Sequence, residues 1–285
     1  MPLEVIGGIE GLRDRLALDR SAGRAIGLVP TMGALHDGHL SLVSRARAEC
    51  AVVVVSIFVN PLQFDRPEDL SAYPRSIDAD LQLCAAGGAD IVFVPTPAEM
   101  YPVPPDCVVE VGRVADHLCG RTRPGHFRGV ATVVMKLFQI AQPGRAYLGE
   151  KDAQQLAVIR RLVTDLNVPI TIVPVPTVRE PDGLALSSRN RGLSADERRV
   201  APVLYEALRD ARQRIAAGDS DAAHVRQMAA DIVERRQGVT LEYLELVDPD
   251  GMQPVGMVDG PVVAAGAIWI GSTRLIDNML CIPPA

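Results

Sequence analysis

Two histidines three residues apart are the side chains of this sequence best suited to chemistry. They lie in the segment 30–39 (PTMGALHDGH), directly after the apolar run 25–29. If a helix begins here, the rings of His36 and His39 lean over the same spot, and each can donate to a phosphate oxygen without a permanent charge at neutral pH. Gly38 lets the backbone approach closely, and the first N–H groups of a helix attract anions. The segment predicts ATP chemistry at the α-phosphate, and the alternative is a helix start with two ordinary histidines.

A second motif, Gly149-Glu150-Lys151-Asp152, follows an apolar run and precedes a helical pattern. Lys151 at the mouth of a sheet is placed to neutralise phosphate charge. Asp152 can hold Mg²⁺ directly or through water, since Mg²⁺ prefers oxygen ligands and keeps several waters. The alternative is a capped helix start with a surface ion pair.

A third motif, Leu186-Ser187-Ser188-Arg189, lies in a stretch full of turn residues. Two hydroxyls beside a guanidinium suit a triphosphate, because Arg offers a bidentate fork and Ser a compact donor. The alternative is a Ser-rich turn. The sequence has neither a Gly-x-Gly-x-x-Gly after a strand nor a Walker-type loop, so the histidine segment and this loop would have to hold the nucleotide.

Three amides, Asn60, Gln63 and Gln155, lie beside the expected strand ends. Neutral amides can bind hydroxyls and carboxylates without changing the charge of a site. For each of them the alternative is a surface amide. The segment 124–129 (PGHFRG) is interpreted as a turn that could close over a substrate, in which His126 by itself is more typical of a structural residue.

Composition limits the classes of protein. The 285 residues are 48% hydrophobic and carry a net charge of −6 without a basic stripe, which argues against a nucleic-acid or anionic-membrane partner. Five scattered cysteines form no zinc-binding spacing and make a disulfide framework unexpected. No apolar run reaches the length of a membrane span, and the first residues do not resemble a signal peptide. We therefore expect a cytoplasmic enzyme.

The elements that must position these residues alternate between strands and helices. Strands are expected at 24–29, 51–59, 90–94, 144–148 and 170–175, and helices at 39–50, 76–86, 130–141 and 152–166. The run 51–59 is apolar on both faces, which is typical of a buried parallel strand. This α/β pattern predicts a doubly wound parallel sheet, in which ligands bind beyond the carboxyl ends of the strands.

The pattern changes after about residue 180. A capping box from Ser194 to Glu197 predicts one long helix whose apolar positions run from Val200 to Ile215. A helix at 221–236 and strands at 241–247 and 262–270 follow. We expect two domains, residues 1–178 and a smaller C-terminal α+β domain at 179–285.

Taken together, six motifs resemble the pantoate–β-alanine ligase (pantothenate synthetase) family of the His-x-Gly-His nucleotidyltransferase superfamily. They are the segments 30–39, 58–64 (FVNPLQF), 72–75 (AYPR), 149–152, 154–155 and 187–191, within a resemblance that runs from about residue 4 to 280. The resemblance implies a Rossmann-like first domain, a small C-terminal domain that closes over the active site, and a homodimer.

The resemblance also implies roles for residues. His39 would be the catalytic proton donor, with His36 assisting at the phosphates and Lys151 and Arg189 balancing charge. Pantoate would be bound by Gln63 and Gln155, with Gln63 also near β-alanine and Asn60 beside it. The ATP site would be formed by Met32, Gly33, Ala34, Leu35, His36, Asp37, Gly38, His39, Gly149, Glu150, Lys151, Asp152, Val178, Leu186, Ser187, Ser188 and Arg189.

Two positions depart from the family pattern, since Ala153 stands where Tyr is frequent and Leu186 where Met is frequent. Ala153 could loosen one wall of the site, whereas Leu for Met keeps the volume. The helix start at Asp78 and Asp80 is acidic, but no direct Mg²⁺ ligand is assigned from the sequence.

The expected activity is the ATP- and Mg²⁺-dependent condensation of pantoate with β-alanine. Pantoate would attack the α-phosphorus to give pantoyl adenylate and pyrophosphate, and the amine of β-alanine would then displace AMP to give pantothenate. Two alternatives stay open at this point. One is a nucleotidylyltransferase that stops at an adenylated product, and the other is a non-catalytic nucleotide sensor.

Overall fold

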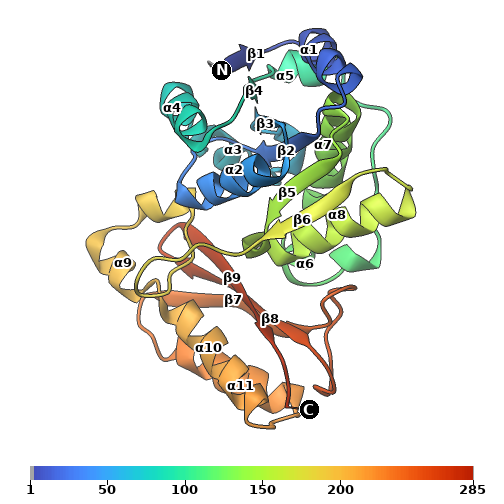
Figure 1. The fold of residues 1–285 in the computed structure, drawn as a ribbon. Helices are drawn as coiled ribbons and strands as arrows, with labels where there is room; N and C mark the ends of the chain where they lie inside the picture. The colour runs from blue at the N-terminus through green and yellow to red at the C-terminus, as the bar shows by residue number, and fades with distance from the viewer. Residues whose placement is uncertain (1–2, 285) are drawn as a thin grey trace. The chain divides into compact units, whose positions relative to one another are not determined.

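The computed structural model describes residues 3–284, which form two compact units. The first unit comprises the chain up to Val111 together with Arg123–Glu150 and Val158–Pro176. The second comprises Gly112–Thr122, Lys151–Ala157 and the chain from Thr177 onward. Figure 1 shows the course of the chain through both. Within residues 3–284, no helix is both long and apolar enough to cross a membrane.

The first unit is built on a six-stranded sheet in which every pair of neighbours is parallel. The strand order is β1-β4-β3-β2-β5-β6. The strands are β1 (Glu4–Ile6), β2 (Ile26–Thr31), β3 (Val52–Ile57), β4 (Ile91–Phe93), β5 (Arg145–Gly149) and β6 (Thr171–Val175). All six residues of β3 are buried, as expected for a strand covered on both faces. The predicted parallel α/β sheet is confirmed.

Helices connect the strands and cover the sheet. They are α1 (Ile9–Ser21), α2 (Asp37–Glu49), α3 (Pro67–Ala72), α4 (Ile77–Gly87), α5 (Pro97–Met100), α7 (His126–Ala141) and α8 (Ala153–Asp165). The helices α2 and α4 pack against each other, and α1 packs against α7. Leu42 and Val43 of α2 share one apolar core with Val53 and Val55 of β3.

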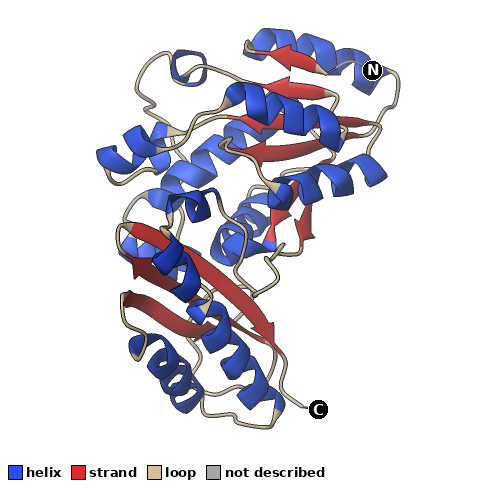
Figure 2. Cartoon of the chain, turned by 90° about the vertical axis from the view of Figure 1, so that its left-hand side faces the viewer, coloured by secondary structure: helices blue, strands red, loops and turns tan. Residues whose placement is uncertain are grey.

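The second unit contains an antiparallel sheet in the order β7-β8-β9, with α10 and α11 packed on it (Figure 2). Its elements are α6 (Leu118–Thr122), α9 (Ala195–Val200), α10 (Val203–Ala216), α11 (Ala222–Glu234), β7 (Val239–Val247), β8 (Val262–Ile270) and β9 (Thr273–Cys281). The core between helices and sheet includes Leu204, Leu208, Leu244 and Ile268. The predicted α+β character of this part is confirmed.

One predicted helix is wrong in its extent. The capping box at Ser194 and Glu197 is present, but α9 ends at Val200 and α10 begins at Val203. Pro202 stands between them, and its ring has no N–H to continue the hydrogen-bond ladder. The helical spacing of apolar residues therefore continues through residues 200–203, although the helix itself is interrupted there.

The order of the strands marks where a ligand fits. Strand β2 lies between β3 and β5, and the chain leaves it toward β3 on one side while β5 and β6 extend the sheet on the other. At such a reversal the loops leave the sheet in opposite directions and open a crevice at the carboxyl ends of the strands. In this sheet the loop after Thr31 and the end of β5 at Gly149 lie at that edge.

Candidate active site

The loop after β2 is held in an uncommon backbone conformation. Gly33 and Ala34 both have positive φ, +83° and +51°. Both oxygens of the Asp80 carboxylate hold this loop, because Oδ2 accepts from the N–H of Ala34 at 2.9 Å and Oδ1 from that of Leu35 at 2.7 Å. Asp80 is only 2% exposed. Its position in the first turn of α4 thus serves the loop that precedes the histidines.

The two histidines begin α2 and lie against each other. The Nδ1 atom of His36 accepts from the N–H of Gly38 at 3.1 Å, and the Nδ1 atom of His39 accepts from the N–H of His36 at 3.3 Å. The ring centroids are 4.2 Å apart. Since both Nδ1 atoms accept, each neutral ring carries its hydrogen on Nε2 and can donate from there. The pair forms a donor set at the positive end of a helix.

Asn60 and Gln63 form a buried amide pair after β3. The Nδ2 group of Asn60 donates to Oε1 of Gln63 and to the carbonyl of Gly129, both at 3.1 Å. Its Oδ1 accepts from the hydroxyl of Tyr101 at 3.0 Å. Asn60 is 1% and Gln63 7% exposed, so the alternative of surface amides is wrong for both. Burial raises the pKa of Tyr101 to about 12, so its hydroxyl stays a donor well above neutral pH.

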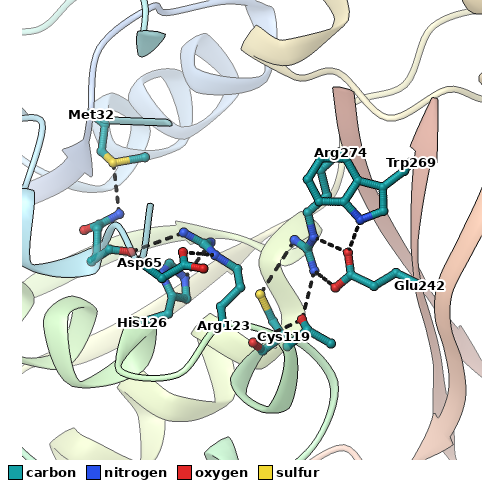
Figure 3. A network of polar contacts seen from close by, with 10 residues as sticks. Met32, Asp65, Cys119, Arg123, His126, Glu242, Trp269 and Arg274 are labelled. Atoms are coloured by element: carbon teal, nitrogen blue, oxygen red, sulfur yellow. Dashed lines mark hydrogen bonds and ion pairs between the residues drawn. The ribbon is translucent and has the colours of Figure 1, made fainter. Parts of the chain in front are cut away.

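The structure brings two of the predicted site residues into contact in the first unit. The Nε2 group of Gln63 points at the sulfur of Met32, 2.9 Å away (Figure 3). A thioether is a weak acceptor, so exchanging this contact for a hydrogen bond to an oxygen acceptor would cost the Gln63 amide little energy. Gln63 is thereby fixed by its Oε1 while its N–H₂ group faces the loop that leads to the histidines.

Arg123 and His126 hold the backbone of Gln63. The Nδ1 atom of His126 donates to the Gln63 carbonyl at 2.8 Å, and Nη2 of Arg123 donates to the same oxygen at 3.2 Å. Arg123 also pairs with Asp65 at 3.1 Å (Figure 3). No motif in the sequence marked Arg123 or Tyr101, because their partners are distant in the chain.

The interpretation of 124–129 as a turn holds for residues 124 and 125 and is wrong for the rest of the segment. His126 through Gly129 form the first turn of α7, where His126 is buried. A Cβ at Gly129 would lie 2.2 Å from the carbonyl oxygen of Leu62. This close approach of α7 to the turn at 61–63 requires glycine and sets the position of the amide pair.

Lys151, Ser187 and Arg189 line one small pocket of the second unit, together with Asn190 and Asp277. The carbonyl of Lys151 accepts from Nδ2 of Asn278 at 2.8 Å, which fixes the backbone at this residue. Ser187 accepts from the N–H of Arg189 at 3.2 Å and so begins a short turn of helix at Ser188–Gly192.

A buried ion pair supports the loop that carries these residues. Arg179 donates to both carboxylate oxygens of Asp277 at 2.6 and 2.9 Å. The same guanidinium donates to the carbonyl of Gly183 at 3.0 Å and lies over the ring of Tyr205. Leu186 adds a backbone hydrogen bond of 3.0 Å to the carbonyl of Val178. The loop is thus tied to β9 on one side and to the segment at Val178 on the other.

A second polar network joins the three strands of the antiparallel sheet, through Glu242 of β7, Trp269 of β8 and Arg274 of β9. Glu242 accepts from Nε and Nη2 of Arg274, both at 2.8 Å, and from the indole N–H of Trp269 at 2.6 Å (Figure 3). Arg274 is 9% exposed and also reaches the sulfur of Cys119 at 3.8 Å. Burial is the largest single influence on the pKa of Glu242 and would raise it, but the hydrogen bonds from Arg274, Thr122 and Trp269 and the charge of Arg274 together lower the pKa. The network holds the segment around Cys119 to the sheet.

The predicted site residues thus fall into two groups, each described within its own unit. Those of the first unit are Met32, Gly33, Ala34, Leu35, His36, Asp37, Gly38, His39, Asn60, Gln63, Gly149 and Glu150. Those of the second are Lys151, Asp152, Gln155, Val178, Leu186, Ser187, Ser188 and Arg189. Asp152 is exposed and Gln155 half-buried on the first turn of α8, next to Ala153.

A protein-made metal cage is not found in the part of the chain that the structure describes. Residues 3–284 contain no group of three His, Cys, Asp or Glu side chains that could hold an ion. Asp80 already accepts from two backbone N–H groups, so its oxygens serve the loop. The residues fit Mg²⁺ only as an ion that is held mainly by phosphate oxygens and water.

Comparison with known proteins identifies relatives over nearly the whole chain. Residues 4–280 match the family described as pantoate-beta-alanine ligase. A pantothenate synthetase of Caldicellulosiruptor saccharolyticus is 47% identical over 276 residues, which cover 97% of this chain and 98% of that protein. Other curated relatives are bifunctional pantoate ligase/cytidylate kinases, and this chain spans about half their length.

Solved structures agree with the sequence relatives. The crystal structure of pantothenate synthetase from Thermus thermophilus superimposes with a TM-score of 0.91 at 44% identity, covering 97% of this chain and 98% of that one. A pantoate-beta-alanine ligase from Francisella tularensis, described as complexed with beta-gamma ATP and beta-alanine, has a TM-score of 0.80 at 37% identity, covering 98% of this chain and 97% of that one. The fold predicted from the sequence is the fold of these proteins.

Proposed function

The chain belongs to the pantoate–β-alanine ligase family, and we propose that it joins pantoate to β-alanine with ATP, which gives pantothenate, AMP and pyrophosphate. The observation that carries the proposal is the pair of Nε2 donors of His36 and His39 at the start of α2, directly after the loop that follows β2. A helix start with neutral donors binds phosphate oxygens and tolerates the approach of an anionic nucleophile.

The first step forms pantoyl adenylate. A carboxylate oxygen of pantoate attacks the α-phosphorus, a P–O bond forms, and the bond to pyrophosphate breaks. In this step negative charge grows on the phosphate oxygens. His39 donates from Nε2 to the oxygens at which this charge develops, and His36 supports it there. Preorganised donors of this kind each contribute about 10²–10³ in rate in well-studied enzymes.

The second unit supplies the positive charge. Lys151 and Arg189 lie around the same small pocket, and an ammonium and a guanidinium are groups that balance the charge of a triphosphate. Hydroxyl donors come from Ser187 and Ser188. The remainder of the proposed ATP site consists of the residues from Met32 to His39, Gly149 to Asp152, Val178 and Leu186.

The second step makes the amide bond. The amine of β-alanine attacks the acyl carbon of the adenylate, a C–N bond forms, AMP leaves, and the amine loses a proton to solvent. Gln63 and Gln155 bind pantoate in this proposal, and Asn60 fixes Gln63 from behind at 3.1 Å. Holding the acyl group and the amine together supplies most of the acceleration that this step needs.

We propose that ATP enters as its Mg²⁺ complex, and that residues 179–285 close over the bound nucleotide. A carboxylate and a triphosphate repel each other, and a divalent ion held by phosphate oxygens reduces this repulsion. Asp152 is exposed and can contact such an ion through water. We further propose a cytoplasmic homodimer, in keeping with a biosynthetic family.

The two alternatives from the sequence are not favoured. A nucleotidylyltransferase or a nucleotide sensor would not form an amide, whereas the matched family and the relatives are named as ligases or synthetases. A single assay separates the three activities. Purified protein with ATP, Mg²⁺ and pantoate should release pyrophosphate, and β-alanine should then be required for AMP and pantothenate. The proposal would be contradicted if the protein formed the adenylate at a normal rate but formed no amide when β-alanine was added.

A further inference from the structure

The first unit contains a groove that the proposed reaction does not use. It lies between α1, the segment 105–109 and α7, and has a volume of about 400 Å³. This volume falls within the range of pockets that hold small molecules. Its apolar wall includes Val108, Val109 and Met135. The N–H of Val109 donates to Thr132 at 3.0 Å, so the segment is tied to α7 and the groove is part of the folded unit.

The charge of the groove has one sign. Arg13 and Lys136 line it, and no Asp or Glu does. Within residues 3–284 neither cation forms a salt bridge. The chain uses lysine at only two positions among 29 basic residues, Lys136 and Lys151. Among the residues that line it, the groove therefore combines an apolar wall with two cations and no carboxylate.

The ammonium of Lys136 is held in place by an aromatic ring. Its Nζ lies 5.3 Å from the centroid of the Tyr101 ring, within the range of a cation–π contact. Tyr101 is itself fixed by its hydrogen bond of 3.0 Å to Asn60. A cation positioned in this way loses little conformational freedom when it receives an anion.

We infer that this groove binds a small organic anion whose carboxylate, sulfonate or phosphate lies at Lys136 and Arg13 and whose apolar body lies on Val108, Val109 and Met135. The ligand's size is set by the 400 Å³ of the groove. The two cations require that the ligand carry negative charge, and the apolar wall requires that the rest of the ligand be apolar. The site is distinct from the residues proposed to bind ATP and pantoate.

The reactivity of a thiol in the groove can show whether a ligand is bound there. Cys107 lines the groove and is exposed, whereas Cys50, Cys84, Cys119 and Cys281 are buried. Iodoacetamide should therefore alkylate Cys107 first in the native full chain, and peptide mass mapping identifies the modified site. An anion in the groove should slow this alkylation.

The test uses 8-anilinonaphthalene-1-sulfonate as the probe anion, with fluorescence titration and Cys107 alkylation measured on the same samples. Lys136→Met keeps the stem and removes the charge, and it should weaken probe binding about fivefold, as expected for one partly screened ion pair. Lys136→Arg should restore binding. Arg161→Met, which removes a charge from α8 at an exposed pair with Asp165, is the matched control and should bind normally.

Three results would overturn the inference. The first is equal probe binding by Lys136→Met and wild type. The second is fluorescence that rises without any protection of Cys107, which places the probe elsewhere. The third is protection of Cys107 that grows with protein concentration in the absence of probe, which would make the groove an interface between copies of the chain. Each result is independent of the ligase assay, so failure of the proposed function would leave this test intact.

Discussion

The carboxylate of Asp80 accepts a hydrogen bond of 2.9 Å from the backbone N–H of Ala34. Its other oxygen accepts from Leu35, so one buried side chain of α4 fixes the loop that leads to His36. A Cβ at Gly33 would lie 2.9 Å from the same carboxylate and at a φ of +83°. The loop from which the two histidines follow thus depends on a side chain more than 40 residues away in the sequence.

Asp80→Asn should destabilise the protein and slow adenylation. An amide retains one acceptor, but its N–H₂ group would face a backbone N–H, which costs about 1–3 kcal/mol when buried. We expect a lower free energy of unfolding in urea, together with a reduced rate of pantoate-dependent pyrophosphate exchange. Asp78→Asn, at an exposed position two residues earlier, is the control and should change neither quantity. Normal exchange in Asp80→Asn would show that the loop is held by other contacts.

His126→Ala should raise the KM for pantoate and leave the KM for ATP unchanged. The variant loses the hydrogen bond of 2.8 Å that holds the carbonyl of Gln63, worth about 1–1.5 kcal/mol or about tenfold in binding. His126→Asn restores a donor at nearly the same place and should recover part of the loss. His224→Ala, an exposed histidine paired with Asp219, is the control in steady-state assays. Equal effects on both substrates would indicate a general loss of structure.

Lys151→Ala should reduce the rate of adenylation by about 10²–10³ without changing the fold. Only the backbone carbonyl of Lys151 accepts from Asn278, and alanine keeps that carbonyl. The melting temperature should therefore stay near the wild-type value. Arg160→Ala, at an exposed site on α8, tests the loss of one positive charge elsewhere. Exchange at the wild-type rate in Lys151→Ala would remove this residue from the site.

Glu242→Gln should destabilise the second unit, with an effect that depends on pH. It leaves the guanidinium of Arg274, 9% exposed, without its carboxylate, which costs about 3–5 kcal/mol for a buried pair. The folded pKa of Glu242 lies below its ordinary value of 4.5, so its contribution is present above pH 4.5 and is lost as the pH falls through the lowered pKa.

Urea unfolding of wild type and Glu242→Gln at several pH values measures this contribution. The difference between the two proteins should be largest near neutral pH and should shrink below pH 4.5. Glu206→Gln, which breaks the exposed pair with Arg236 at 3.0 Å, is the control and should cost less than about 1 kcal/mol. A difference that does not vary with pH would contradict the role assigned to the carboxylate.

Much of the first unit was predictable from the sequence, because a strand that is buried on both faces of a sheet consists of a continuous apolar run. The run that became β3 (Val52–Ile57) is apolar throughout except for Ser56. The antiparallel strand β9 (Thr273–Cys281) was not predicted, because Arg274 and Asp277 interrupt its apolar alternation. Both are buried only because they pair with Glu242 and Arg179, which lie 32 and 98 residues away. No local pattern contains that information.

The candidate site shows the same division. The histidine segment, the Lys151 motif and the Ser-Ser-Arg loop could be named from local residue types. The residues that orient them could not, since Asp80 acts on Ala34 across 46 residues and Arg123 on Gln63 across 60. His126 was interpreted as part of a turn because the glycines around it are turn residues, yet Gly129 is needed for contact between α7 and the turn at 61–63.

We propose above all that the Nε2 donor of His39 stabilises charge that develops at the α-phosphate. The most direct measurement is the rate at which labelled pyrophosphate exchanges into ATP in the presence of pantoate, compared between wild type and His39→Ala of unchanged melting temperature. We expect the exchange rate to fall by about 10²–10³. Exchange near the wild-type rate would contradict the account.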